Sequence, residues 1–402
     1  MGNRDREILR ELAKEKLEIS QLPIMRQRAE EWTKHNDLKG ERPMLHFEIW
    51  TLTDPAFHHQ CKCESEEARA IERELGHSIL NHKMVGDDRV VTDEFICLYD
   101  ASMIPFDLPV KKQKTEGIGF HIINQIEDLD STEQIQPSRM TFDAEKSLKR
   151  KEFAEEQIGD ILNVRMGMGS IGACLSSDVV HRMGMENMFM AMYDNPENFH
   201  YMMNSLSDDY VKFIKELERR GMLCANNKND LVAQGSFGFC GSLPDTARTA
   251  ADCWGYADSQ ETVGISADMF HEFFFPYYKK IADNFGLLSY GCCEPVHQFW
   301  EKSLSNFTNL RKISISPWCD EEYMGDALRG SGVIYQRKPS PNFVGVGKYL
   351  DEAAFREHIK KTVHAARGCK LEISFRDVYN LEGEPSKPRR AVEIAREEIE
   401  KM

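Results

Sequence analysis

Two adjacent cysteines stand in the segment SYGCCEPVH, residues 289–297, with Glu294 directly after them. Thiolate is a soft ligand that selects zinc over magnesium or calcium, and catalytic zinc takes about three protein ligands with one position left open. Cys292 and Cys293 therefore need a further ligand, and the candidates are Glu294, His297 and, from the segment ADSQET, Glu261. The pattern alone leaves open a metal site, a redox pair and an inert buried corner.

A second set of polar side chains alternates along the segment MLHFEIWTL, residues 44–52. Successive side chains of a strand point to opposite faces, so His46, Glu48 and Trp50 share one face. If that face looks into the protein, a histidine and a carboxylate are available to supply a proton or orient a substrate. A solvated rim is the equally acceptable alternative.

Two cations follow another predicted strand. In QRKPSP, residues 336–341, Arg337 and Lys338 stand where they could hold an anionic group of a substrate. Here too the alternative is a pair of solvated surface charges.

Two further motifs favour ordinary structure over chemistry. Gly167, Gly169 and Gly172 match the G-x-G-x-x-G pattern of dinucleotide sites, but the following residues are helical where such a site needs a second strand with an acidic end. The segment HHQCKCE, residues 58–64, fits a helix-entry loop with half-buried cysteines better than a metal site.

Short apolar segments that alternate with helical ones must position these residues. This order is typical of parallel β/α units, and a count of about eight strands predicts a TIM (β/α)8 barrel. In a barrel, function lies at the C-terminal ends of the strands and in the loops that follow. The sequence predicts a single domain over residues 1–402, with an N-terminal helical extension over 1–42 and a small β-hairpin insertion from strands at 89–100 and 117–126. The barrel strands are expected at 44–52, 161–169, 231–239, 254–260, 287–293, 311–317, 332–338 and 369–375.

Composition excludes several partners. The net charge of −15 argues against nucleic acid or anionic membrane, because phosphate binding needs a positive surface. No stretch approaches the roughly 18–20 apolar residues of a membrane span. The first residues lack the apolar core of a secretion signal, and eleven cysteines without module spacing suit a reducing cytoplasm, where we expect the protein.

Residues 257–295, ADSQETVGISADMFHEFFFPYYKKIADNFGLLSYGCCEP, resemble the uroporphyrinogen decarboxylase superfamily, and the similarity extends over about 160–380. The resemblance implies a TIM barrel. The decarboxylase branch carries an Arg-Gln-Ala-Gly-Arg stretch, where this chain reads FEIWTLT. The zinc-dependent corrinoid methyltransferases carry His-x-Cys, where this chain has Tyr290 and Cys292, and a late cysteine that LEISFRDV lacks. YGCCEP, with SISPW and RKPSP, is most similar to the divergent demethylating branch of anaerobes.

The resemblance implies a methyltransferase that moves a methyl group from a small O-methyl or N-methyl donor to the cob(I)alamin of a separate corrinoid protein. Cobalamin is expected on that partner because the chain has no Asp-x-His-x-x-Gly stretch. The implied metal, zinc, is held by Cys292, Cys293 and Glu261; a homodimer is left open. The other implied roles are catalytic for Asp258, His46 and Glu48, and substrate-binding for Trp50, Tyr290, Arg337 and Lys338.

Two alternatives stay open. One is a metal-independent decarboxylase or lyase of a small carboxylate, and the other is a barrel that binds a ligand without turnover. The geometry of the cysteine segment supplies a sharper expectation. Both sulfurs can reach one pocket only if strand pairing stops at Gly291 or Cys292, since glycine turns freely and Pro295 cannot extend a sheet. We expect that pocket to receive Glu261 as well.

Overall fold

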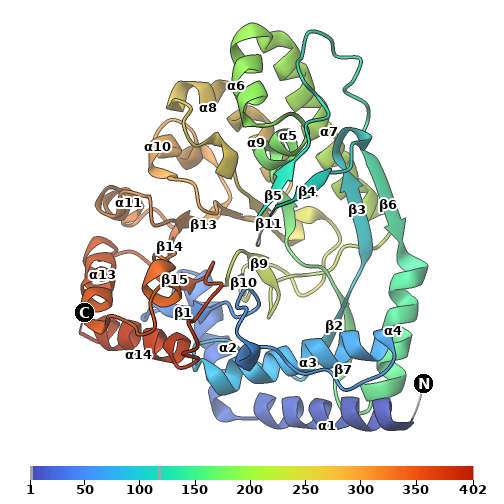
Figure 1. The fold of residues 1–402 in the computed structure, drawn as a ribbon, viewed down its shortest axis with the longest axis vertical. Coiled ribbons are helices and arrows are strands. Elements are labelled where there is room, and N and C mark those ends of the chain that lie inside the picture. The colour runs from blue at the N-terminus through green and yellow to red at the C-terminus, as the bar shows by residue number, and fades with distance from the viewer. Residues whose placement is uncertain (1–2, 116–118, 402) are drawn as a thin grey trace.

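Two helices open the part of the chain that the computed structural model describes, which comprises residues 3–115 and 119–401. Helix α1 (Asn3–Ser20) and helix α2 (Pro23–Asn36) are separate because Pro23 fits only the first turn of a new helix. Helix α1 packs against α3 (Glu66–Met84) and α4 (Ala144–Ile158). Both helices lie within residues 1–42, where a helical extension was predicted (Figure 1). Its buried contacts come from Leu9, Ala13, Ile71, Leu75, Ala154 and Ile158.

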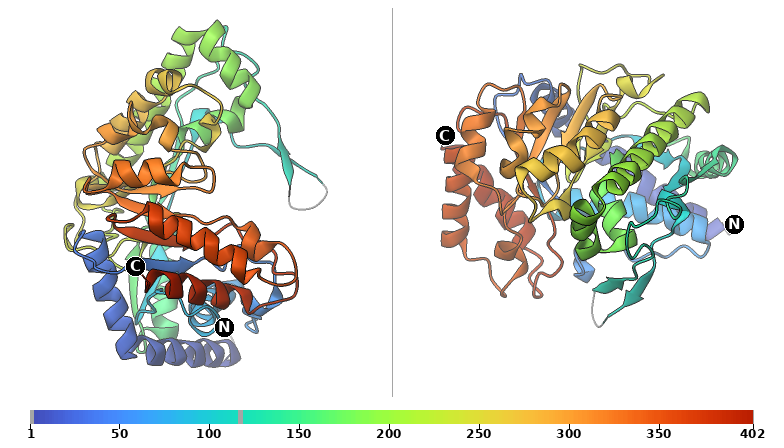
Figure 2. Two further views of the ribbon diagram at one scale, coloured as in Figure 1. Left: turned by 90° about the vertical axis from the view of Figure 1, so that its left-hand side faces the viewer. Right: turned by 90° about the horizontal axis from the view of Figure 1, so that it is seen from above.

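Seven parallel strands form the central sheet, in the order β1-β15-β14-β13-β12-β11-β8. Helices follow most of these strands and lie outside the sheet (Figures 1 and 2). The strands are β8 (Ile171–Ala173), β11 (Trp254–Ala257), β12 (Leu287–Tyr290), β13 (Leu310–Ile315), β14 (Ile334–Arg337), β15 (Leu371–Phe375) and β1 (Met44–Phe47). The helices are α5 (Leu175–Met183), α6 (Met185–Asp194), α7 (Pro196–Arg219), α8 (Ala267–Phe273), α9 (Phe275–Ala282), α10 (His297–Trp300), α11 (Glu321–Leu328), α12 (Asn342–Gly345), α13 (Glu352–Ala365) and α14 (Lys387–Ile399).

This architecture is compatible with a TIM-like fold, although the described strand pairings do not show the predicted closed ring of eight strands. In the described part of the chain, no strand pairing joins β8 to β1. The segment predicted at 161–169 forms β7 (Asn163–Gly167), which pairs in parallel with β2 (Glu94–Leu98) as a separate two-stranded sheet. After β1, the next strand along the chain that belongs to the seven-stranded sheet is β8.

The segment predicted as a barrel strand at 231–239 is a hairpin instead. Strand β9 (Leu231–Ala233) pairs antiparallel with β10 (Ser236–Phe237). Gly235 between them has φ +80°, a left-handed conformation that glycine adopts without strain and that permits this tight turn. The hairpin contacts the sheet, because Ser374 Oγ donates to Gly235 O at 2.9 Å.

The insertion also differs from its prediction. The predicted strand 89–100 contains β2, whose partner is β7, and the start of β3 (Asp100–Ile104), whose partner is β6 (Arg139–Asp143). The small hairpin is formed by β4 (Lys112–Lys114) and β5 (Phe120–Ile122), which lie between β3 and β6 along the chain, and it projects from the body (Figure 2). Residues 117 and 118 of the other predicted strand lie outside the described residues.

The two faces of the central sheet differ in chemistry. On the outer face, apolar side chains join the core shared with the helices, among them Leu45, Phe47, Ile313, Ile315, Ile373 and Phe375. The inner face, which contacts the β9–β10 hairpin, carries alternating polar side chains that are also buried. They are His46, Tyr256, Ser289, Lys312, Ser314, Gln336, Glu372 and Ser374. The TIM barrels of ordinary enzymes fill this position with Val, Ile and Leu.

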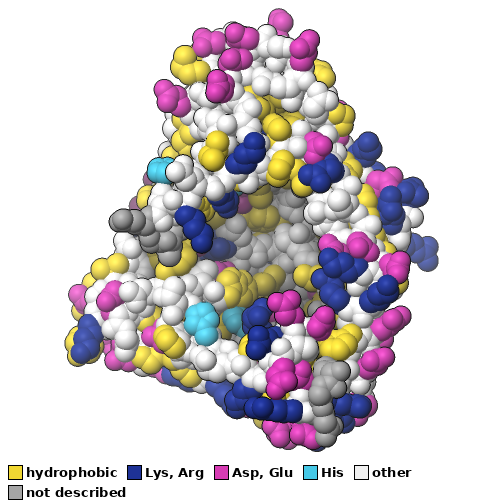
Figure 3. Space-filling model, turned by 45° about the vertical axis from the view of Figure 1, so that its right-hand side comes forward, with side chains coloured by type: hydrophobic (Ala, Val, Ile, Leu, Met, Phe, Trp, Pro, Cys, Tyr) yellow, Lys and Arg dark blue, Asp and Glu magenta, His cyan; other side chains and the backbone are white. Residues whose placement is uncertain are grey.

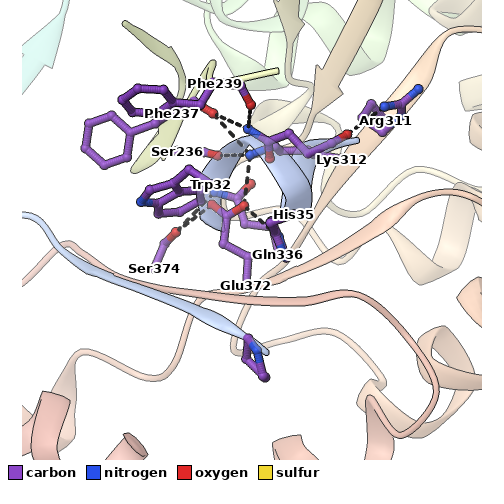
Figure 4. Close-up of polar contacts among 12 residues, drawn as sticks. Trp32, His35, Ser236, Phe237, Phe239, Arg311, Lys312, Gln336, Glu372 and Ser374 are labelled. Atoms are coloured by element: carbon purple, nitrogen blue, oxygen red, sulfur yellow. Dashed lines mark hydrogen bonds and ion pairs between the residues drawn. The ribbon is translucent and has the colours of Figure 1, made fainter. Parts of the chain in front are cut away.

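An ion pair closes the N-terminal end of the inner face (Figure 4). Lys312 Nζ lies 2.9 Å from Glu372 Oε2 and also donates to Ser236 Oγ of the hairpin. His35 of α2 lies 3.6 Å from the same carboxylate. Burial alone would raise the pKa of Glu372, but Lys312 and His35 lower it to about 2. We call Lys312, Glu372, His35 and Ser236 the base network.

Candidate functional site

A cavity of about 390 Å³ lies at the opposite, C-terminal end of the same strands. Its walls come from the loops that directly follow β11, β12, β13, β14 and β15, together with the tip of the β9–β10 hairpin. The position agrees with the expectation that function lies where parallel strands end. We call it the mouth cavity; its lining residues are Gln234, Gln260, Cys292, Cys293, Pro317, Trp318, Lys338, Pro339, Pro341, Arg376, Asp377 and Tyr379.

The two cysteines open together onto the mouth cavity because the strand that carries them ends early. Strand β12 stops at Tyr290, and Gly291 N–H makes its last bond to the neighbouring strand, to Ala257 O at 2.8 Å. Gly291 then turns the chain with φ +98°. The sulfurs of Cys292 and Cys293 lie 3.5 Å apart. The prediction that pairing stops here and that both sulfurs share one pocket is confirmed.

Glu294 fixes the loop that presents the cysteines. One carboxylate oxygen accepts the N–H of Cys292 at 2.8 Å, and the other accepts the N–H of Ser259 at 2.8 Å. The side chain is fully buried, so these bonds replace its hydration. Glu294 therefore ties the loop after β12 to the loop after β11, and its oxygens are occupied by backbone.

The cysteine pair is electrostatically asymmetric. The hydrogen bond from Cys292 lowers the pKa of Cys293, with help from the cations Lys338 and Arg376, and the same contact raises the pKa of Cys292. Cys292 S–H also lies 2.6 Å from Gln234 Oε1. Of the two sulfurs, Cys293 is therefore the more readily ionised.

Glu261 does not reach the sulfurs, which corrects the predicted ligand set. It lies in a short turn (Gln260–Thr262) and accepts a hydrogen bond from Ser176 Oγ of α5 at 2.8 Å. Throughout residues 3–115 and 119–401, no three His, Cys, Asp or Glu side chains are grouped so that they could hold a metal ion. The described donors therefore do not fit the expected three-ligand zinc site, and no chemical step is derived through zinc.

Two other predicted residues line a buried region behind the mouth cavity. Asp258 accepts a hydrogen bond from Tyr256 at 2.6 Å, and burial together with the nearby Glu294 and Glu261 raises its pKa to about 7. Tyr290 lies on the outer face of β12, fully buried, and donates to Ser259 Oγ at 2.6 Å. The structure therefore places Tyr290 in the packing between sheet and helices, which corrects its predicted contact with substrate.

Arg337 also faces outward, which corrects its predicted contact with substrate, whereas Lys338 lies in the wall of the mouth cavity. Strand β14 continues through Arg337, so its guanidinium points to the helices, where it pairs with Glu321 at 2.8 Å. Lys338, on the opposite face, lines the mouth cavity and donates to Cys292 O at 3.0 Å. The second cation of the cavity is Arg376, which the sequence did not single out.

Arg376 follows strand β15 and is incompletely paired. Its Nη1 is buried without a hydrogen-bond partner among the described residues, and its nearest approach to Glu48 is 3.8 Å. It also lies 3.3 Å from Asp377, whose φ of +59° is unusual for a residue other than glycine and brings its carboxylate to 3.7 Å from Cys293 Sγ. Arg376 could have been identified from the sequence because it directly follows a strand.

His46 and Glu48 reach the interior, whereas Trp50 does not. His46 is fully buried; its Nδ1 lies 3.0 Å from Asp87, and its Nε2 has no partner among the described residues. Glu48 is also buried, Oε1 has no such partner, and burial raises its pKa. Trp50 is 41% exposed, because β1 ends at Phe47 and the predicted alternation stops there.

Asp87 is a further residue that the sequence did not single out. Its carboxylate is held by the N–H of Phe47 at 2.9 Å and fixes the ring of His46. The two adjacent aspartates in the segment GDDR, directly after α3, were the available signal.

One face of the molecule is visibly hollowed, with lysine and arginine side chains around the hollow (Figure 3).

Comparison with known proteins assigns no family. No family model and no curated protein matches the chain. A methyltransferase from Methanosarcina mazei is similar in structure, with a TM-score of 0.47 and 10% sequence identity, over 81% of this chain and 85% of that chain. Similarity at this level decides nothing about activity. No helix in the described part of the chain is long and apolar enough to cross a membrane.

Proposed function

We propose that the chain is a methyltransferase, which moves a methyl group from a small O-methyl or N-methyl donor to the cob(I)alamin of a separate corrinoid protein. The observation that supports this best is the thiol pair at the C-terminal ends of the strands. Cys292 and Cys293 share the wall of the mouth cavity with Lys338 and Arg376. A donor held by these groups would be available to a second protein that approaches the same end of the sheet.

For an O-methyl donor, the chain's own groups would bind the donor and supply a proton. Arg376 and Lys338 hold its anionic or electron-rich part. When the carbon–oxygen bond breaks, the methyl carbon passes to the corrinoid acceptor, which supplies the electron pair of the new bond. The oxygen keeps the electrons of the broken bond. The Cys292 thiol donates a proton to that oxygen, because an alkoxide is a poor leaving group, and Lys338 stabilises the thiolate that remains.

Mixing the protein with reduced corrinoid carrier and a panel of methoxy and N-methyl compounds tests this proposal. We expect the absorbance of cob(I)alamin to give way to that of methylcobalamin with at least one donor. Replacement of Cys292 by Ala should slow the transfer about 100-fold, the usual contribution of a positioned proton donor. Cys61→Ala, outside the cavity, is the control. If no donor methylates the carrier, the proposal is wrong.

A second candidate is a decarboxylase or lyase that acts on a small carboxylate. Among the described residues, Nη1 of Arg376 has no hydrogen-bond partner, and a buried arginine donor of this kind suits a carboxylate oxygen. Incubation with small carboxylic acids and measurement of released carbon dioxide distinguishes this candidate from methyl transfer. Zinc analysis of the same preparation shows separately whether either activity needs a metal.

A further inference from the structure

We propose that Cys292 and Cys293 are a modification site, at which a peroxide converts the two thiols into a disulfide between neighbouring residues. This goes beyond methyl transfer, since it is a reaction of the protein with an oxidant. The cysteines are adjacent in sequence, their sulfurs lie 3.5 Å apart, and both line the mouth cavity.

The two sulfurs are close neighbours before any reaction. A disulfide has a sulfur–sulfur bond of about 2.05 Å, so the two sulfurs need to approach each other by about 1.5 Å. All eleven cysteines, each within the described residues, are free in this structure, so the pair is present as two thiols.

The surroundings favour Cys293 as the sulfur that reacts first. It is half-buried, whereas Cys292 is buried. Both line the cavity with the cations Lys338 and Arg376, and the Asp377 carboxylate lies 3.7 Å from Cys293 Sγ. Thiolate character and access together select the cysteine that peroxide oxidises. Cys292, held against it, is the resolving thiol.

The reaction balances with one peroxide. The Cys293 thiolate attacks hydrogen peroxide, the oxygen–oxygen bond breaks, and the products are a sulfenic acid and hydroxide. The Cys292 sulfur then attacks the sulfenic sulfur, and the departing hydroxide takes the Cys292 proton as water. Two electrons pass from the two sulfurs to peroxide. The disulfide removes both the thiolate and the thiol from the cavity wall.

A single peptide reports the outcome. Trypsin releases residues 281–302, IADNFGLLSYGCCEPVHQFWEK, which contain these two cysteines and no other. After the reduced full-length protein is treated with a slight excess of hydrogen peroxide, we expect this peptide to lose two hydrogen atoms in mass and to regain them with a reductant. No methyl donor or corrinoid is needed, so the result does not depend on the proposed function.

Serine variants assign the two roles. Cys293→Ser should slow oxidation of this peptide at least tenfold, whereas Cys292→Ser should accumulate a sulfenic acid at Cys293 that dimedone traps. Cys61→Ser, a half-exposed cysteine elsewhere, should leave the reaction unchanged. If a variant fails to fold, limiting iodoacetamide on the unaltered protein should still label Cys293 before Cys292. Equal labelling, sulfinic acids without a disulfide, or a disulfide to another cysteine such as Cys319 would overturn the proposal.

Discussion

The buried cations at the two ends of the inner face of the sheet differ in their hydrogen-bond partners. At the base, the ammonium of Lys312 has a carboxylate at 2.9 Å and a hydroxyl, and both partners are fully buried (Figure 4). At the mouth, Arg376 Nη1 and Glu48 Oε1 are buried without hydrogen-bond partners among the described residues, and the two side chains approach only to 3.8 Å.

Buried polar atoms are nearly always hydrogen-bonded, so groups without a partner need a reason. In the base network, Lys312 is paired with Glu372 and holds the β9–β10 hairpin against the sheet through Ser236. His35 Nε2 lies 3.6 Å from the same carboxylate and has no hydrogen-bond partner among the described residues. At the mouth, Arg376 Nη1 and Glu48 Oε1 lack hydrogen-bond partners among the described residues, as expected of groups that bind a ligand. The difference indicates that one strand face provides rigidity at one end and binding capacity at the other.

The largest effect on the free energy of unfolding is expected from breaking the ion pair between Lys312 and Glu372. Replacing Lys312 by Met leaves the Glu372 carboxylate buried without its cation, which costs about 3–5 kcal/mol of unfolding free energy. Urea denaturation measures the change. The double variant Lys312→Met with Glu372→Met should recover most of the loss, because both charges are then gone. A loss no greater than that of Lys302→Met, an exposed control, would contradict the structural role of the base.

The two ends should also respond oppositely to pH. The raised pKa of Asp258, about 7, means that the folded protein keeps a proton that the unfolded chain releases near pH 4. Stability should therefore fall as pH rises from 4 to 7, by on the order of 3 kcal/mol, and Asp258→Asn should remove this fall. The lowered pKa of Glu372, about 2, has the opposite sign: its contribution is lost as pH falls from 4.5 to 2. Denaturation midpoints across pH measure both, and an unchanged slope in Asp258→Asn would refute the first.

Replacing Arg376 by Met should weaken ligand binding. Removal of a charged donor from a carboxylate costs about 1.5–3 kcal/mol, or at least tenfold in affinity. Calorimetry with methoxyacetate and N,N-dimethylglycine, each compared with its neutral amide, measures this. The control is Arg337→Met, which should instead destabilise the fold, because Arg337 pairs with Glu321. Equal binding of acid and amide would contradict an anion-holding role for Arg376.

The smallest effect is expected at Trp50. Its side chain is 41% exposed and does not line the mouth cavity. Trp50→Ala should change the unfolding free energy by less than about 0.5 kcal/mol and leave ligand binding unchanged. A tenfold loss of binding would show that the site extends beyond the mouth cavity.

Local backbone chemistry made part of this site predictable from sequence. Gly291 and Pro295 bracket the end of β12, so the presentation of both cysteines follows from residues within the segment itself. The parallel strands were likewise predictable from the alternation of apolar and helical segments. These features depend on neighbours in the chain.

The errors arise where tertiary context decides. The segment 231–239 has the composition of a buried strand, and only contacts with the sheet show that it folds back at Gly235. Arg337 was expected to hold a substrate anion because it stands near a strand end; β14 ends at Arg337, whose side chain pairs with Glu321, and Lys338 lines the cavity instead. Glu261 was expected at the sulfurs, but its partner is Ser176 on α5.

The polar inner face has a thermodynamic consequence beyond any single site. Unfolding raises the heat capacity when apolar surface becomes hydrated and lowers it when polar surface does. Because His46, Lys312, Gln336, Glu372 and Ser374 are buried where an ordinary barrel has aliphatic side chains, unfolding exposes more polar surface than usual for a sheet of this kind. The stability curve should therefore be flatter with temperature, and resistance to cold should accompany resistance to heat.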